Sequence, residues 1–393
     1  METWSGAPSI GFVSTYPPTI CGLSSFTASL VHAIAENRGS RDGVRVVGLA
    51  DWASAVPVGD MAYRHKRGDR ASLGLAIKYL NGFDAVSIQH EFGIFGGRDG
   101  DEVVEIVAAL DSPAVVTFHT VLKNPSDHQR SIVESLAETA ARSVVMSETA
   151  FDRLVTRYDV DPDRIAMIPH GADARFGGPS LATGDRPLVL TWGLIGPGKG
   201  LETSIAAFAG LTDLRPLPRY LIAGATHPNV RERQGEAYRD SLVALVSDLG
   251  LGAVVEFDDR YLDRAVLARL VRSADFVVLP YGSVEQVTSG VLVEAIAASK
   301  PVIATAFPHA LELLAGGAGI TVPHDDPDAL AAALRSVLTD GRLAARMQRH
   351  SHDLRLGRYW PSIGKKYDDL ISSVAFGATR AGSHPTGAYL VAG

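Results

Sequence analysis

The sequence has few of the features that mark disulfide-rich, membrane-spanning or nucleic-acid-binding proteins. Cys21 is the single cysteine in 393 residues, so no disulfide framework can form within the chain. No uncharged apolar run reaches the ~18 residues that a membrane-spanning helix needs. The net charge is −7 and no dense cluster of lysine and arginine occurs, which argues against general nucleic-acid binding.

The beginning of the chain and its cysteine content also bear on location. The opening METWSGAPSI lacks the basic and apolar regions of a secretory signal peptide. A single cysteine fits a reducing compartment. We therefore expect a cytoplasmic protein without a transmembrane segment, for which peripheral membrane contact stays open. No cluster of histidines and cysteines suggests a metal site.

Short apolar runs rich in β-branched residues alternate with stretches of helical spacing, such as 24–36 and 131–141. The runs that we predict as strands are 8–14, 44–50, 84–90, 113–119, 142–147, 164–169, 187–192, 218–224, 253–257, 275–280, 300–305 and 319–322. This alternation predicts α/β architecture, in which parallel sheets are covered by helices on both faces.

The rhythm is interrupted once, at a segment rich in Gly, Pro and Asp over 170–187, which indicates a linker. Together with the chain length, it predicts two doubly wound, Rossmann-like domains, 1–182 and 183–357. The polar, glycine-rich residues 376–393 are expected to form a disordered tail. Ligands of such sheets bind beyond the carboxyl ends of the strands, here in a cleft between the domains.

The stretch LVLTWGLIGPGKGLETSIAAF has the chemistry of an anion site. Gly193, Gly198 and Lys199 have the spacing of a phosphate-binding P-loop, but Gly200 replaces the hydroxyl residue that would bind Mg²⁺. The dinucleotide pattern G-x-G-x-x-G also fails, because Leu201 holds its third position. What remains is a glycine loop that opens a helix beside a lysine, which suits a diphosphate. A plain turn with a solvated lysine is the alternative.

A second informative stretch is VVLPYGSVEQVTSGVLVEAIAASKPVIATAFPHALELL. Ser289 and Gly290 stand where a helix begins, and backbone amides at such a place can hold phosphate. Glu294 lies about one turn inside, where a carboxylate facing the cleft can accept two hydrogen bonds from a vicinal diol such as ribose. Alternatively, Glu294 is a surface residue that favours the helix dipole.

Together, these stretches resemble the retaining GT-B glycosyltransferases of family 4, over roughly residues 8–375. The resemblance implies two Rossmann-like domains facing across a cleft, with the C-terminal helix 358–375 packing back on the first domain. It implies transfer of a sugar from a nucleotide-diphosphate donor to a carbohydrate or other hydroxyl acceptor. It also implies that neither a metal nor another cofactor takes part.

The resemblance assigns roles to individual residues. In STYPPTICGLSSFTASLVHAIA, Gly22 matches the glycine that contributes backbone to the donor phosphate, although Cys21 replaces its usual glycine neighbour. In VTFHTVLKNP, His119 matches the histidine that lines the donor-sugar pocket. In the family's G-R-x-x-x-x-K-G loop, Lys199 takes the position of the lysine that binds the diphosphate; Gly193 and Gly200 are the glycines.

The E-x7-E element of the family places its ribose-binding glutamate on Glu294. Its first glutamate, which contacts the donor sugar, falls on Gln286, one residue after Glu285. The arginine of the glycine loop is replaced by Leu194, which removes a bidentate cation beside a dianion. Gln286 can hydrogen-bond a sugar hydroxyl but carries no charge to stabilise an oxocarbenium ion. His170 stands where the family more often has asparagine.

Two further stretches have less direct support. SIQHEFGIFGG puts His90 and Glu91 at a strand end, where we expect them to bind the acceptor; a hydrogen-bonded pair within a turn is the alternative. In the C-terminal helix, Trp360, Ile363 and Tyr367 have the spacing of one buried face and are predicted to be core.

Other functions remain open at this point. Leu194 and Gln286 motivate the alternative of a nucleotide-sugar-binding protein with little or no transferase activity. An NAD-dependent oxidoreductase would fit the alternation of strands and helices, but the glycine fingerprint is missing from both halves.

Overall fold

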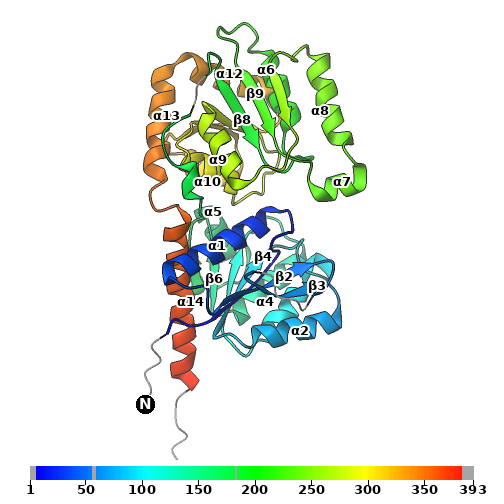
Figure 1. Ribbon diagram of the computed structural model, residues 1–393, viewed down its shortest axis with the longest axis vertical. Helices are drawn as coiled ribbons and strands as arrows, with labels where there is room; N and C mark the ends of the chain where they lie inside the picture. Colours follow the sequence, from blue (N-terminus) through cyan, green and yellow to red (C-terminus); the bar gives the residue numbers. More distant parts are fainter. Residues whose placement is uncertain (1–5, 55–58, 182–183, 383–393) are drawn as a thin grey trace, which may run out of the picture.

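The computed structural model describes residues 6–54, 59–181 and 184–382. These residues form two domains stacked along the long axis of the molecule, each built around its own parallel sheet (Figure 1). The prediction of two Rossmann-like α/β domains is confirmed.

Within the described residues, the first sheet has seven parallel strands in the order β3-β2-β1-β4-β5-β6-β7. The strands are β1 (Ile10–Ser14), β2 (Val44–Ala50), β3 (Met61–Lys66), β4 (Ala85–His90), β5 (Ala114–Phe118), β6 (Arg142–Val145) and β7 (Ile165–Met167). The helices of this domain are α1 (Gly22–Arg38), α2 (Arg70–Leu80), α3 (Glu102–Ala108), α4 (Asp127–Thr139) and α5 (Glu148–Arg157).

The second sheet has six parallel strands among the described residues, in the order β10-β9-β8-β11-β12-β13. They are β8 (Leu188–Trp192), β9 (Arg219–Ala223), β10 (Val255–Asp258), β11 (Phe276–Leu279), β12 (Val302–Thr305) and β13 (Gly319–Val322). The helices are α6 (Leu201–Ala209), α7 (Pro228–Gln234), α8 (Ala237–Asp248), α9 (Arg264–Ser273), α10 (Gly290–Ala297), α11 (Pro308–Leu314), α12 (Pro327–Thr339) and α13 (Gly341–Leu354).

Both sheets reverse their winding direction at one place. In the first sheet this switch point lies between β1 and β4, and in the second between β8 and β11. Loops that leave neighbouring strands at a switch point diverge to opposite faces, which opens a crevice at the carboxyl ends of the strands. The fold thus puts the loops after β1, β4, β8 and β11 around two crevices.

Every run that the sequence predicted as a strand contains one, but β3 was missed. This edge strand carries Arg64, His65 and Lys66, which mask its pattern. His65 is fully buried because Ser72 in α2 hydrogen-bonds its Nδ1 at 3.0 Å and Glu102 approaches its Nε2 at 3.2 Å. Side-chain partners from later segments therefore make this polar strand possible.

The expected linker 170–187 is partly anchored. Ala172 and Phe176 are fully buried in the core of the second domain. The Ala172 amide also donates to the carbonyl of Arg358, and the Trp360 amide donates to the carbonyl of Ala172. These hydrogen bonds join the two segments in which the chain passes from one domain to the other, near Ala172 and near Trp360. The predicted boundary between 182 and 183 lies outside the described residues.

The last helix, α14 (Trp360–Gly382), returns to the first domain and lies along α1 (Figure 1). Trp360, Ile363 and Tyr367 are buried in the core there, which confirms the predicted face. The helix runs on to Gly382, so residues 376–382, expected as part of a disordered tail, are helical. The rest of that expected tail, 383–393, lies outside the described residues.

Two carboxylates of the second domain hold the first. Glu312 on α11 accepts hydrogen bonds from the amides of Glu148 and Thr149 at the start of α5, at 2.9 and 3.1 Å. Glu285, in the loop after β11, accepts 2.8 Å hydrogen bonds from Arg153 and from the Lys123 amide. These contacts, the interdomain clasp, join the domains on the α5 side.

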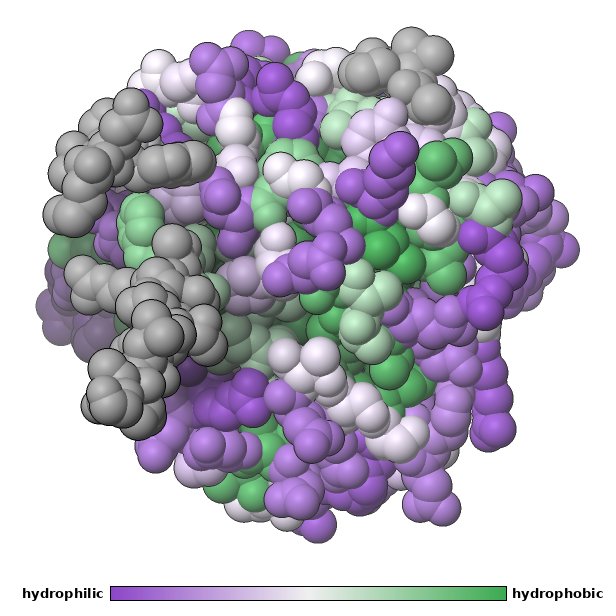
Figure 2. Space-filling view, turned by 90° about the horizontal axis from the view of Figure 1, so that it is seen from below, coloured by the Kyte–Doolittle hydropathy of each residue, from purple (hydrophilic) through white to green (hydrophobic). Residues whose placement is uncertain are grey.

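None of the helices described is at once long enough and apolar enough to cross a bilayer. Figure 2 shows the end of the molecule formed by the first domain, where patches of apolar side chains lie between hydrophilic ones. Peripheral membrane contact, which the sequence left open, stays open.

Replacing Glu312 with alanine should loosen the clasp. The change leaves two amides at the N-terminus of α5 without their carboxylate, which we expect to cost about 1–2 kcal/mol. Thermal unfolding checks the stability, and small-angle scattering should show a larger radius of gyration as the domains separate more often. Glu312→Gln, which keeps one acceptor oxygen, is the milder control. An alanine variant with unchanged unfolding and scattering would show that the contact does not hold the domains.

Candidate functional site

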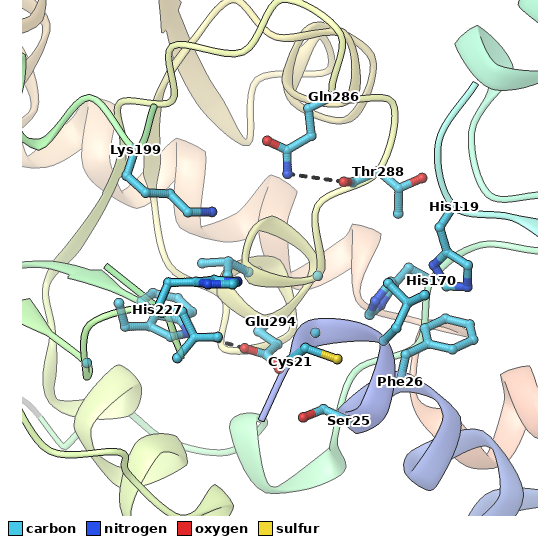
Figure 3. A pocket seen from close by; sticks show the side chains of 18 of the residues that line it. Cys21, Ser25, Phe26, His119, His170, Lys199, His227, Gln286, Thr288 and Glu294 are labelled. Atoms are coloured by element: carbon cyan, nitrogen blue, oxygen red, sulfur yellow. Dashed lines mark hydrogen bonds between the residues drawn. The ribbon is translucent and has the colours of Figure 1, made fainter. Parts of the chain in front are cut away.

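A cavity of about 720 Å³ lies between the two domains, at the carboxyl ends of both sheets. Most of the residues that the sequence singled out line it: Gly22, Glu91, His119, Gly193, Lys199, Gln286, Gly290 and Glu294. His90, Gly200 and Ser289 do not. Figure 3 shows Lys199 and His227 on one side of this cavity, and His119, His170 and Phe26 on the other.

The glycine loop after β8 reaches the cavity through a close backbone contact. Gly200 has φ 64°, and a Cβ placed on it would lie 1.8 Å from the carbonyl oxygen of Pro280. Only glycine fits this left-handed, crowded position. Gly200, which we expected to bind the donor, therefore turns the chain into α6, and Lys199 before it faces the cavity.

Lys199 brings an uncompensated charge to this place. Its Nζ lies 4.7 Å from the ring centroid of Tyr281. Within the part of the chain that the structure describes, no carboxylate forms an ion pair with it. Burial lowers the pKa of the ammonium, because removing it from water disfavours the charged form. An anion in the cavity would supply the missing counter-charge.

Glu294 faces the same cavity from α10, and both of its oxygens are held. Oε2 accepts a hydrogen bond from the indole of Trp192 at 3.2 Å, and Oε1 pairs with Nη1 of Arg264 at 2.5 Å. The carboxylate is thus fixed in direction. Each oxygen keeps a second lone pair with which it can accept a hydroxyl.

The neighbouring residues Gln286 and Glu285 make different contacts: Gln286 faces the cavity, and Glu285 belongs to the interdomain clasp. The Gln286 side-chain amide donates to the Thr288 carbonyl at 3.2 Å, which leaves its Oε1 as an acceptor toward the cavity (Figure 3). Glu285, also at the cavity wall, is engaged by Arg153. The neutral side chain is therefore the one available to a ligand.

The start of α10 differs from our expectation. The Ser289 amide, expected to bind phosphate, donates instead to Nδ1 of His309 at 2.9 Å. Its hydroxyl caps α10 by accepting from the Leu292 amide. Gly290 does line the cavity, and a Cβ there would lie 3.0 Å from Nε2 of His170. The amide of Gly290, at the first helical position, has no carbonyl partner within the helix.

Histidine and aromatic rings form the wall contributed by the first domain. Nε2 of His119 hydrogen-bonds Oε1 of Gln89 at 2.9 Å, and the ring of Phe26 meets the imidazole edge to face at 4.6 Å. Burial lowers the pKa of His119 to about 3 and that of His170 to about 4. Both rings are therefore neutral at pH 7, and they can hydrogen-bond hydroxyls without adding charge.

Glu91 and His90, expected to bind the acceptor, are separated by the fold. Glu91 lines the cavity, accepts hydrogen bonds from the hydroxyl of Thr120 and the amide of Phe92, and has its pKa raised by burial. His90 is fully buried beside the rings of Phe92 and Phe118, and no described residue hydrogen-bonds either of its ring nitrogens. Its ring points into the core, so the expectation for His90 is wrong.

Several cavity residues were not identified from the sequence. They include Trp192, Arg260 and Arg264, together with Trp360, which was predicted only as core; His227 was indicated only by its place in the loop after a predicted strand. Trp192 and His227 each follow or end a predicted strand, a signal that applies to many residues. Arg264 gives no signal, since its partner Glu294 is 30 residues away. Among the described residues, no group of three or more His, Cys, Asp or Glu side chains is arranged to hold a metal ion.

Comparison with known proteins places these features in a family. The pattern of the glycosyl transferases group 1 family matches residues 178–353, and that of glycosyltransferase family 4 matches residues 31–176. The chain is 30% identical to D-inositol 3-phosphate glycosyltransferase of Corynebacterium glutamicum over 66% of its length and 68% of that protein's. It is 28% identical to the namesake enzyme of Corynebacterium kroppenstedtii, over 69% and 63%.

A solved structure shows the same fold. HepE of Anabaena, in complex with UDP and glucose, superposes with a TM-score of 0.71 at 17% identity, over 93% of this chain and 100% of HepE. The chain spans about two thirds of the length of the Corynebacterium relatives. The matches to both domains and the shared fold lead to one conclusion: this chain belongs to the group 1 glycosyltransferases.

Proposed function

We propose that this protein transfers a sugar, with retention of configuration, from a nucleoside-diphosphate sugar to a hydroxyl acceptor, without a metal ion. The observation that carries the proposal is the Lys199 ammonium, which enters the interdomain cavity without a carboxylate partner among the described residues. Glu294 lines the same cavity. A cation and a diol-binding carboxylate in one concavity match a nucleoside diphosphate.

The largest chemical task in this reaction is to stabilise the charge on the departing diphosphate. Lys199 supplies a full charge, while the first-turn amides of α1 at Gly22 and of α10 at Gly290 supply oriented dipoles. These electrostatic interactions become stronger when the domains close on the substrates, because closure excludes water from the site. Glu294 would hold the ribose hydroxyls.

Retention follows if the acceptor attacks the face from which the diphosphate leaves. The bond between the anomeric carbon and the phosphate oxygen breaks, the bond to the acceptor oxygen forms, and the acceptor proton passes to the departing oxygen. Glu285, the carboxylate next to Gln286 in the chain, is paired with Arg153 and is therefore not free to act as a covalent nucleophile. His119 and Gln286 would position the sugar by hydrogen bonds.

A second candidate is a protein that binds nucleotide sugars with little or no transfer. Leu194 removes one cation from the diphosphate loop, and Gln286 presents a neutral acceptor at the sugar position. Both changes leave binding possible and reduce the charge available to the transition state. Turnover distinguishes the candidates, since both require donor binding and one requires a transferred sugar.

A panel of UDP-, GDP- and ADP-sugars tests the donor. The cognate donor should raise the melting temperature, because a ligand at a hundredfold excess over its Kd adds about 2.7 kcal/mol to stability. Release of nucleoside diphosphate with inositol phosphates and neutral sugars as acceptors then measures transfer, and NMR of the product shows its anomeric configuration. Inversion would refute retention, and binding without transfer to any acceptor would favour the second candidate.

Lys199→Ala should weaken nucleoside-diphosphate binding by about 1.5–3 kcal/mol, the range for a hydrogen bond to a charged group. Titration calorimetry measures the loss. Lys366→Ala is a matched control, because Lys366 does not line the cavity. This variant should bind the nucleoside diphosphate as tightly as the native protein. Equal affinity of Lys199→Ala and the native protein would remove the diphosphate assignment.

Gln286→Glu should change the rate of transfer or the choice of sugar more than the affinity for free nucleotide. The substitution restores a negative charge beside the anomeric centre, where it can stabilise an oxocarbenium ion. Comparing kcat for several donor sugars with the Kd for free nucleoside diphosphate separates these effects. A variant altered in nucleotide affinity alone would show that Gln286 does not contact the sugar.

A further inference from the structure

His227 lies directly against the glycine loop after β8 (residues 193–200), the proposed diphosphate loop. Its backbone amide donates to the carbonyl of Ile195 at 2.7 Å, and the Ile195 amide donates to the carbonyl of Ala225 at 2.9 Å. These bonds extend the pairing of β8 with β9 by a short bridge between Ile195 and Thr226. His227 is thus fixed beside the residue that follows Leu194, in the second domain's wall of the cavity.

The hydrogen bond of its ring defines which nitrogen can face a ligand. His227 is the N-cap of α7, and its Nδ1 accepts a hydrogen bond from the Asn229 amide at 3.2 Å. A neutral imidazole that accepts at Nδ1 carries its proton on Nε2. Burial and the charge of Lys199 lower the pKa of His227, so the ring is neutral in the free protein. It therefore offers an N–H donor, next to Lys199, rather than a lone pair.

The loop lacks a donor at this place. Leu194 lines the cavity where the resemblance puts an arginine, whose N–H groups would bind the diphosphate. The other guanidinium groups of this wall are already engaged: Arg264 pairs with Glu294, and Arg260 pairs with Asp258. His227 keeps its Nε2–H unassigned to any carboxylate among the described residues, and Figure 3 shows it on the same side as Lys199.

We propose that His227 donates a hydrogen bond from Nε2 to the diphosphate and replaces part of the function of the arginine absent at Leu194. This inference rests on the proposed function, since it assigns a further residue to the same donor site. The neutral ring binds the phosphate at its own position beside Lys199, and the α7 cap holds the ring in place before the substrate arrives.

His227→Asn tests this directly. Asparagine is a favourable N-cap residue and keeps the acceptor for the Asn229 amide, so the free protein should keep its melting temperature. It does not extend a ring N–H into the cavity. We expect the affinity for the tightest-bound of UDP, GDP and ADP to fall about tenfold, the effect of one hydrogen bond to a charged group. The corresponding nucleoside monophosphate separates the two phosphates. If His227 contacts the distal phosphate, the substitution should weaken monophosphate binding less than diphosphate binding. If it contacts the proximal phosphate, both affinities should fall by a similar factor.

Two further variants complete the experiment. His227→Ala removes both the cap and the donor, so it should lower the melting temperature as well as the affinity. Leu194→Arg in the His227→Asn background should restore diphosphate affinity by returning a guanidinium to the loop. Calorimetry gives the affinities, and thermal unfolding separates loss of the cap from loss of the donor.

The outcomes are distinct. Unchanged diphosphate affinity in His227→Asn would overturn the inference while leaving the proposed function intact. An affinity loss that accompanies a lower melting temperature in His227→Asn, and that Leu194→Arg does not restore, would assign His227 a structural role and also overturn it. If the native protein binds none of the three nucleoside diphosphates, the proposed function fails first, and this inference fails with it.

Discussion

The glycine loop after β8 depends on one steric constraint, the contact between Gly200 and the carbonyl of Pro280. Any side chain at Gly200 would collide with the backbone where β11 ends. A similar contact occurs at Gly224, where a Cβ would lie 2.0 Å from the carbonyl oxygen of Gly193. The loops after β8, β9 and β11 are thereby packed backbone to backbone at the switch point. Lys199 and His227 reach the same cavity because those backbones touch.

The charges of the cavity are arranged unequally. Arg264 and Arg260 each have a carboxylate partner, and Glu294 is held on both oxygens. Among the residues that the structure describes, no carboxylate pairs with Lys199, whose ammonium lies near the ring of Tyr281. A cation that keeps an aromatic neighbour and lacks a counter-ion costs stability in the free protein, and an anionic ligand would recover that cost. The site is in this sense incomplete until a ligand binds.

The sequence predicted the sheets well because their strands are buried on both faces and read as continuous apolar runs. It also located Lys199 and His119, which follow β8 and β5 at the edge where ligands bind, and Glu294, one turn inside α10; all three line the cavity. It failed for His90, since alternation along β4 cannot tell a residue that ends in the core from its neighbour Glu91 in the cavity. Only the packing of Phe92 and Phe118 around the ring decides that.

The amides at the start of α10 show a second limit of sequence reasoning. From their positions in the sequence alone, the amides of Ser289 and Gly290 are equally suited to bind a phosphate. The structure separates them because His309, from α11, takes the Ser289 amide. A partner 20 residues away thus determines which amide remains free to bind a ligand, and no local sequence pattern predicts that hydrogen bond. Arg264 was missed for the same reason, since its value comes from the distant Glu294.

The adjacent residues Glu285 and Gln286 connect the clasp to the chemistry. Glu285 accepts from Arg153 and from the Lys123 amide, both in the first domain, while Gln286 turns its Oε1 to the cavity. Because the two residues are neighbours in the chain, the contacts of Glu285 with the first domain also fix the place of Gln286, the proposed sugar contact. If the domains open, Glu285 leaves Arg153 and the loop that holds Gln286 loses an anchor. In the proposed reaction, closure and positioning of the sugar would therefore be coupled, and a nucleotide sugar would be protected from hydrolysis until both domains have closed around it.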